Sequence, residues 1–106
     1  MTLSTHVLDA VSGRPAVGVP VSLLDSNYTD LADSTTDDDG RIGQLAGTLA
    51  AGVYRLRFDT ATYFAAHDID AFYPEIVITF QVTDPAAKYH VPVLLSPFAY
   101  STYRGS

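Results

Sequence analysis

Two histidines and one arginine are the residues of this sequence best suited to catalysis. His6 and His90 lie in segments where apolar and polar residues alternate, which predicts strands and therefore a firm geometry for both rings. A histidine has an ordinary pKa of about 6.5, so it is the readiest general base near neutral pH. Arg41 follows the tight-turn sequence Asp39-Gly40 and could bind an anionic group. Taken singly, each of these residues is more often structural or solvated than catalytic.

The final four residues, Tyr103-Arg104-Gly105-Ser106, offer a second group of polar contacts. Tyr and Ser supply hydroxyl groups, Arg supplies a permanent charge, and Gly lets the backbone come close to a neighbour. Two strand-like segments lead directly into them, whereas chain ends are usually disordered. We expect this terminus and its carboxylate to contact a small polar ligand. The alternative is that Tyr103 closes a strand and that Arg104 is solvated.

Other chemistries find little support in the sequence. Two histidines could belong to a metal site, but no third ligand follows at a recognised spacing, so no metal is expected. The acidic segment Asp37-Asp38-Asp39-Gly40 resembles part of a calcium loop, but that loop would place Ala46 where a bidentate Glu is required. No Gly-x-Ser-x-Gly motif, dinucleotide loop or phosphate-binding loop occurs, so no cofactor is expected either.

The composition is typical of one globular domain, which we expect to span residues 1–106. The chain is 47% hydrophobic, which is ample for one core. A formal charge of -6, with only six scattered Lys and Arg residues, argues against nucleic acid as a partner. The absence of cysteine excludes disulfides and is compatible with a reducing compartment. No segment approaches the roughly 20 apolar residues of a membrane span, and the N-terminus lacks a signal-peptide pattern, so we expect a cytoplasmic protein without a membrane partner.

About seven or eight short strands and one helix are predicted. The strands are expected at 3–11, 19–25, 30–36, a short segment that begins with Arg41, 52–59, 76–83, 89–95 and 98–103. A turn is expected at Ser12-Gly13-Arg14-Pro15, after the first strand. A helix with a Thr cap is expected at 60–67, with His67 at its surface end. Alternation is clean in 52–59, where Tyr54, Leu56 and Phe58 share the core face. These elements predict an all-β fold, an antiparallel β-sandwich with one short helix.

The segment 89–95 is apolar on both faces. One face carries Tyr89, Val91, Val93 and Leu95, and the other carries His90, Pro92 and Leu94. A strand that is polar on neither face is buried on both, so we expect the His90 face to pack against another chain. Proline cannot donate a ladder hydrogen bond, so Pro92 predicts an edge or a bulge.

The sequence resembles the 5-hydroxyisourate hydrolases of the transthyretin-related family over essentially its whole length. The resemblance is carried by Ser4-Thr5-His6-Val7-Leu8-Asp9 with Ser12-Gly13-Arg14-Pro15-Ala16, by Thr36-Asp37-Asp38-Asp39-Gly40-Arg41, by Phe72-Tyr73-Pro74-Glu75, and by Tyr89-His90-Val91-Pro92 through Leu95-Ser96-Pro97-Phe98 to Tyr103-Arg104-Gly105-Ser106. The terminal tetrapeptide is the most specific part, because transthyretin shares the sandwich but not this tail. Asp37 stands where the family often has Asn.

The resemblance implies a transthyretin-like (prealbumin-like) sandwich and the hydrolysis of 5-hydroxyisourate to 2-oxo-4-hydroxy-4-carboxy-5-ureidoimidazoline, a step of urate degradation. It implies a catalytic set, which is His6, Arg41, His90 and Ser106. It also implies substrate contacts, which are His6, Arg41, Tyr103, Arg104 and Gly105. The family's assembly implies a homotetramer with sites between subunits.

The expected reaction is attack of water on a lactam carbonyl. One neutral histidine takes the proton from water, and the other orients water or substrate or protonates the leaving nitrogen; the residues leave open which does which. Arg41 would stabilise the oxyanion, while Ser106 and Tyr103 would position substrate or water without a covalent intermediate. Two alternatives are a non-catalytic immunoglobulin-like sandwich, which needs neither histidine, and a carrier that binds a small ligand without turnover.

Overall fold

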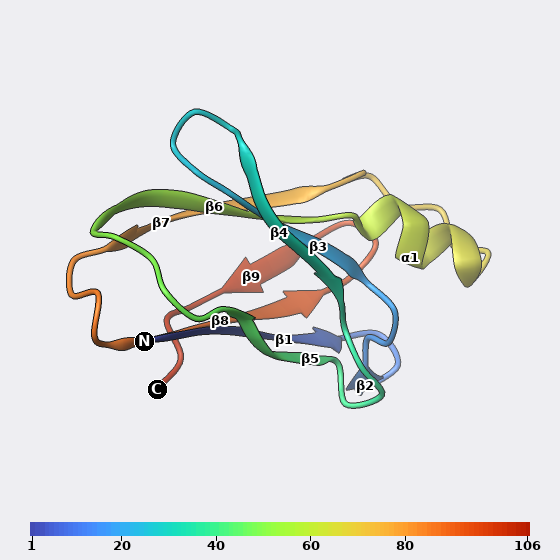
Figure 1. Ribbon diagram of the computed structural model, residues 1–106. Coiled ribbons are helices and arrows are strands. Elements are labelled where there is room, and N and C mark those ends of the chain that lie inside the picture. Colours follow the sequence, from blue (N-terminus) through green and yellow to red (C-terminus); the bar gives the residue numbers. More distant parts are fainter.

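Nine strands and one helix make up the fold in a computed structural model that describes all 106 residues (Figure 1). The strands are β1 (Thr2–Asp9), β2 (Arg14–Pro15), β3 (Pro20–Leu24), β4 (Asp30–Thr35), β5 (Arg41–Ala46), β6 (Gly52–Phe58), β7 (Ile76–Val82), β8 (Lys88–Leu95) and β9 (Tyr100–Thr102). The helix α1 (Thr60–Ala66) lies between β6 and β7 in the chain. It is too short to cross a membrane.

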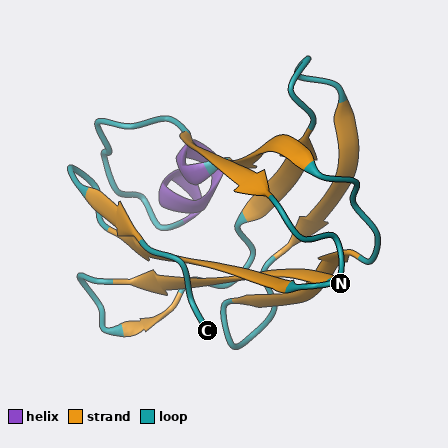
Figure 2. Cartoon of the chain, turned by 90° about the vertical axis from the view of Figure 1, so that its left-hand side faces the viewer, coloured by secondary structure: helices purple, strands orange, loops and turns teal.

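The strands form two sheets. The first sheet has the order β2-β1-β8-β9, and β5 pairs with the same edge of β1 as β2. The second sheet has the order β4-β3-β6-β7. Figure 2 shows the two layers of strands from the side, with both chain ends beside the first sheet. The predicted all-β sandwich with one short helix is confirmed, although β1 and β8 at the centre of the first sheet run parallel.

A core of apolar side chains fills the space between the sheets. In β6 the predicted core face is correct, because Tyr54, Leu56 and Phe58 are buried. In β1 every second residue from Leu3 to Asp9 is buried, so the intervening side chains lie on the outer face of the first sheet. That outer face carries His6, which makes β1 both a core strand and a carrier of polar groups.

Two strand predictions differ from the structure because local turns are tighter than expected. Arg14 and Pro15 were expected in a turn, but Gly13 adopts a positive φ of 73° and returns the chain early enough for them to pair with β1 as β2. The last strand starts at Tyr100 rather than at residue 98. The reason is that Ser96 donates both its N–H and its hydroxyl to Ala99 O, at 3.0 and 2.7 Å, and so closes a turn.

The helix occupies the predicted segment, but the prediction of a Thr cap was wrong. Asp59 is the N-cap, and its Oδ1 accepts from Thr62 N at 3.1 Å. Thr60 is the first helical residue, and its hydroxyl donates to Tyr73 O at 2.9 Å. A carboxylate was available one residue earlier, and Asp is among the preferred N-cap residues. His67 lies exposed at the helix end, as predicted.

The prediction that Pro92 marks an edge or a bulge was also wrong. Pro92 is buried inside β8, which has β1 on one side and β9 on the other. Its carbonyl accepts from Thr102 Oγ1 at 2.8 Å, so its nitrogen, on the same side of the strand, also faces β9. The regular pairing of β8 with β9 ends at Thr102, opposite Val93. The missing N–H therefore interrupts the ladder instead of excluding the strand from the sheet interior.

Candidate active site

The pairing of β1 brings three of the predicted residues onto one outer face of the first sheet. In the parallel pair with β8, Ser4 lies opposite His90 and His6 lies opposite Pro92, two residues further along. In the antiparallel pair with β5, His6 lies directly opposite Arg41. Residues two apart on a strand share a face, so both imidazoles and the guanidinium belong to the same surface.

These side chains surround a depression with a volume of about 300 Å³. It is lined by His6, Leu8, Arg41, His90, Pro92, Val93, Leu94, Tyr103, Gly105 and Ser106. Six of the seven predicted site residues are among them. No three His, Asp or Glu side chains come close enough together to hold a metal ion. The polar groups available are therefore two imidazoles, one guanidinium, two hydroxyls and backbone amides.

The tail reaches this depression by continuing the register of β9 past Pro92. Thr102 lies opposite Val93, and Gly105 lies opposite His90, which is the same register three residues further along. Gly105 N donates to His90 O at 2.8 Å and fastens the tail there. A Cβ on Gly105 would collide with Cδ2 of the His90 ring. Glycine is required at this position because the tail backbone packs directly against the imidazole.

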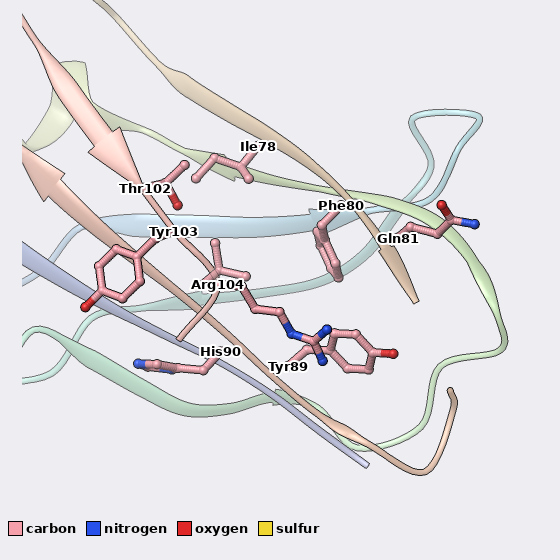
Figure 3. Close-up of a pocket in the computed structure, with 9 residues that line it drawn as sticks. Ile78, Phe80, Gln81, Tyr89, His90, Thr102, Tyr103 and Arg104 are labelled. Carbon is pink, nitrogen blue, oxygen red and sulfur yellow. The ribbon is translucent and has the colours of Figure 1, made fainter. Parts of the chain in front are cut away.

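Arg104 is the one predicted site residue that the structure does not bring to the depression. Its guanidinium lies over the Tyr89 ring, 4.8 Å from the centroid, and its Nη2 is 3.4 Å from Lys88 O. It lines a different cavity, of about 290 Å³, beside Phe80 and Tyr89 (Figure 3). His90 and Tyr103 line this cavity as well, so it adjoins the depression. The stacking on Tyr89 holds Arg104 and the tail against β8.

The surroundings of His90 favour its neutral form. The pKa of His90 is lowered from its ordinary value of 6.5, chiefly by partial burial and further by the nearby positive charges of Arg41 and His6. Hydrogen bonding to Ser4 acts in the opposite direction. At neutral pH His90 is therefore an uncharged imidazole, which is able to accept a proton.

The turn before β5 positions Arg41 through a carboxylate. Asp37 Oδ1 accepts from Asp39 N and from Arg41 N, each at 2.9 Å. These backbone hydrogen bonds, that from Arg41 first, lower the pKa of Asp37. Gly40, with a φ of 73°, lies so close to the backbone of Val7 that no larger residue fits there. The acidic segment therefore forms the turn that leads into β5, and Arg41 is the first residue of that strand.

Ser4 is a residue of the site that the sequence analysis did not single out. Its Oγ lies 2.7 Å from His90 Nδ1, although the two residues are 86 positions apart. The contact depends on the parallel register of β1 and β8, which no local pattern indicates. The only available signal was its place two residues before His6, in one of the stretches that carry the family resemblance.

The chain is similar to known proteins in both sequence and structure. A sequence model of the HIUase/Transthyretin family matches residues 3–105. A 5-hydroxyisourate hydrolase of Salmonella dublin is 47% identical over 109 residues, covering 98% of this chain and 80% of that protein. The solved 5-hydroxyisourate hydrolase of Klebsiella pneumoniae superposes with a TM-score of 0.92 and 39% identity over the whole of both chains. Sea bream transthyretin in complex with thyroxine has a TM-score of 0.91 and 32% identity, covering 99% of this chain and 95% of that one. The chain belongs to the HIUase/Transthyretin family.

Proposed function

We propose that this protein hydrolyses 5-hydroxyisourate. The observation that carries the proposal is the grouping of His6, Arg41, His90, Tyr103 and Ser106 around one depression on the outer face of the first sheet. A hydrolase of a small oxygen-rich ring needs a base for water, a positive group for the oxyanion and polar groups that orient the ring. Each of these is present. The relatives named 5-hydroxyisourate hydrolase add support from sequence and structure alike.

The reaction begins with a water molecule held beside His90. Neutral His90 takes a proton from the water as its oxygen attacks the lactam carbonyl carbon, and Arg41 stabilises the charge that develops on the carbonyl oxygen. The bond between that carbon and the ring nitrogen then breaks. The carbon becomes the carboxylate of 2-oxo-4-hydroxy-4-carboxy-5-ureidoimidazoline, and the nitrogen receives a proton. His6, across the depression, is the group that protonates this nitrogen or orients the substrate.

The tail orients the substrate instead of reacting with it. Tyr103 and Ser106 line the same depression and carry hydroxyls that can donate to or accept from the ring. Gly105 contributes close packing against His90. No serine nucleophile is invoked, because water activated by an imidazole is sufficient for the chemistry.

The proposal includes a homotetramer with sites between subunits and a cytoplasmic location. Large apolar side chains stay exposed near the depression in the single chain, among them Leu94 at 41% and Tyr103 at 62%. Exposed apolar residues grouped around a polar site favour contact with another copy. Sedimentation velocity should give four times the mass of one chain, and a monomer at micromolar concentration would contradict the assembly.

The test of function is the decay of ultraviolet absorbance of freshly generated 5-hydroxyisourate. We expect the protein to accelerate this decay well beyond the spontaneous rate, with the ring-opened carboxylate as product. The similarity to transthyretin provides the main rival, a carrier. Saturable binding of substrate or of thyroxine without any acceleration would favour the carrier and overturn the proposal.

A further inference from the structure

We propose that Ser4 is a positioning residue that holds His90 in the Nδ1–H tautomer, so that Nε2 is the atom that takes the proton from water. This inference deepens the proposed function and rests on it for its kinetic part. It assigns the base among the two histidines and gives a role to a side chain that does not line the depression.

The contact is short and its scaffold is rigid. Ser4 Oγ and His90 Nδ1 are 2.7 Å apart, which is within the range of a good hydrogen bond. The two residues face each other in a parallel pairing that runs without a break from Thr2 and Lys88 to Asp9 and Leu95. β5 pairs with the other edge of β1, and the tail pairs with the other edge of β8. Neither strand can shift away from the other without breaking the sheet.

The ring cannot easily turn away from Ser4. Gly105 packs against Cδ2 and Cγ of the imidazole so closely that even a methyl group does not fit between them. This packing restricts partial rotation of the ring. The hydrogen bond at Nδ1 then selects between the two flipped orientations, which have nearly the same shape.

The direction of the hydrogen bond decides the chemistry. A serine hydroxyl can donate or accept, and neutral imidazole carries one N–H. In the proposed arrangement the His90 Nδ1–H donates to Ser4 Oγ, which lies 2.7 Å away. With the proton on Nδ1, the lone pair is on Nε2, which has no hydrogen-bond partner within the chain. The charged and titratable groups facing His90 are Arg41 on β5 and His6 on β1, and both act to lower the pKa of His90.

The spectroscopic test needs no substrate. Long-range ¹H–¹⁵N spectra of uniformly ¹⁵N-labelled protein above pH 7 report which nitrogen of each histidine is protonated. We expect His90 to show a protonated Nδ1 and an unprotonated Nε2. We expect Ser4→Ala to shift both nitrogen signals toward the average of the two tautomers, whereas Ser4→Thr keeps the hydroxyl and the original signals. An Nε2–H signature in the unmodified protein would overturn the proposal.

The kinetic test separates positioning from folding. Ser4→Ala should lower kcat about tenfold with KM within about twofold, and Ser4→Thr should recover most of the loss. Ser22→Ala is a matched control, because Ser22 also bonds through its hydroxyl from a strand, to Asp33 at 2.6 Å, but in the other sheet. A loss of kcat with unchanged ¹⁵N signals would contradict tautomer control. If the protein does not turn over 5-hydroxyisourate at all, the proposed function fails, while the spectra still decide the Ser4 contact.

Discussion

The two ends of β1 hold polar groups in opposite ways. At the C-terminal end, Asp9 is only 5% exposed, and its carboxylate has every partner it needs. Oδ1 accepts from Val11 N at 2.9 Å and Ser12 N at 3.1 Å, and Oδ2 accepts from Tyr63 OH at 2.8 Å. Burial, with help from the Asp9 hydrogen bond and charge, raises the pKa of Tyr63 to about 12. This network is complete within the chain.

The N-terminal half of β1 contacts His90, whose hydrogen bonding within the chain is incomplete. His90 has a partner at Nδ1 but none at Nε2, and it borders a depression. No buried side-chain polar atom of the chain lacks a partner, so the open nitrogen of His90 is one that water or a ligand can reach. The polar groups of Asp9 are used up within the fold, whereas His90 keeps one nitrogen available for chemistry.

Removing the His90 imidazole should have the largest effect on catalysis. We expect His90→Asn to lower kcat by about 10² or more, because the base for water is lost while the shape is nearly kept. His67→Asn is the matched control, since His67 is exposed at the end of α1. Steady-state decay of 5-hydroxyisourate measures both. Equal rates for the two variants would remove His90 from the mechanism.

Removing a hydrogen bond from the Asp9 network should lower the stability of the protein and leave catalysis unchanged. Tyr63→Phe removes the hydroxyl that Asp9 accepts, and we expect the free energy of unfolding to fall by about 2 kcal/mol, because a buried carboxylate oxygen loses its partner. Tyr54→Phe is the comparison, since Tyr54 OH donates to the uncharged carbonyl of Ala50 at 2.8 Å and should cost about 1 kcal/mol. Urea unfolding measures both. A kcat for Tyr63→Phe reduced as far as that of His90→Asn would end the distinction between the two regions.

Displacing the base without removing it should have an intermediate effect. In Gly105→Ala the new methyl group meets the His90 ring, so we expect kcat/KM to fall about tenfold through misplacement of the imidazole. Gly43→Ala in β5 has open space around the new methyl and should be neutral. The melting temperature of both variants should stay close to that of the parent. Full activity of Gly105→Ala would mean that the ring has more freedom than the packing indicates.

The smallest expected effect is a change in the pKa of His90 when the charge of Arg41 is removed. Since Arg41 lowers the pKa of His90, Arg41→Gln should move the His90 titration to higher pH, whereas Arg41→Lys keeps the charge and should move it less. In the parent protein kcat/KM should therefore hold through neutral pH and decline only below pH 6.5, as His90 becomes protonated. Proton NMR titration of each variant and of the parent follows His90 directly. A downward shift in Arg41→Gln would contradict the electrostatic account.

Local sequence patterns predicted most of the helices and strands, but they did not predict how the strands pair. Alternation correctly assigned β6 and its core face, because period two follows from strand geometry itself. The parallel pairing of β1 and β8 has no such local signature, so the Ser4 contact could not be predicted. β2 was missed because two residues are too few to show any period.

Residue type and the family resemblance led to seven predicted site residues, and their roles stay predictions. His6, Arg41, His90, Tyr103, Gly105 and Ser106 meet at one depression. Arg104 was grouped with its sequence neighbours, yet an extended tail directs consecutive side chains to opposite faces. Its stacking on Tyr89 could have been anticipated by applying to the tail the alternation that was applied to the strands.

The parallel pairing of β1 and β8 also has a consequence for the order in which the protein is made. Ser4 leaves the ribosome 86 residues ahead of His90. The sheet that joins them cannot close before β8 has been made, and such long-range pairing is slow. Until then the apolar inner side of β1 lacks its parallel neighbour and depends on early pairing with β2 and β5 for protection from aggregation. Activity should therefore appear only after β8 and the segment that pairs with it have been made.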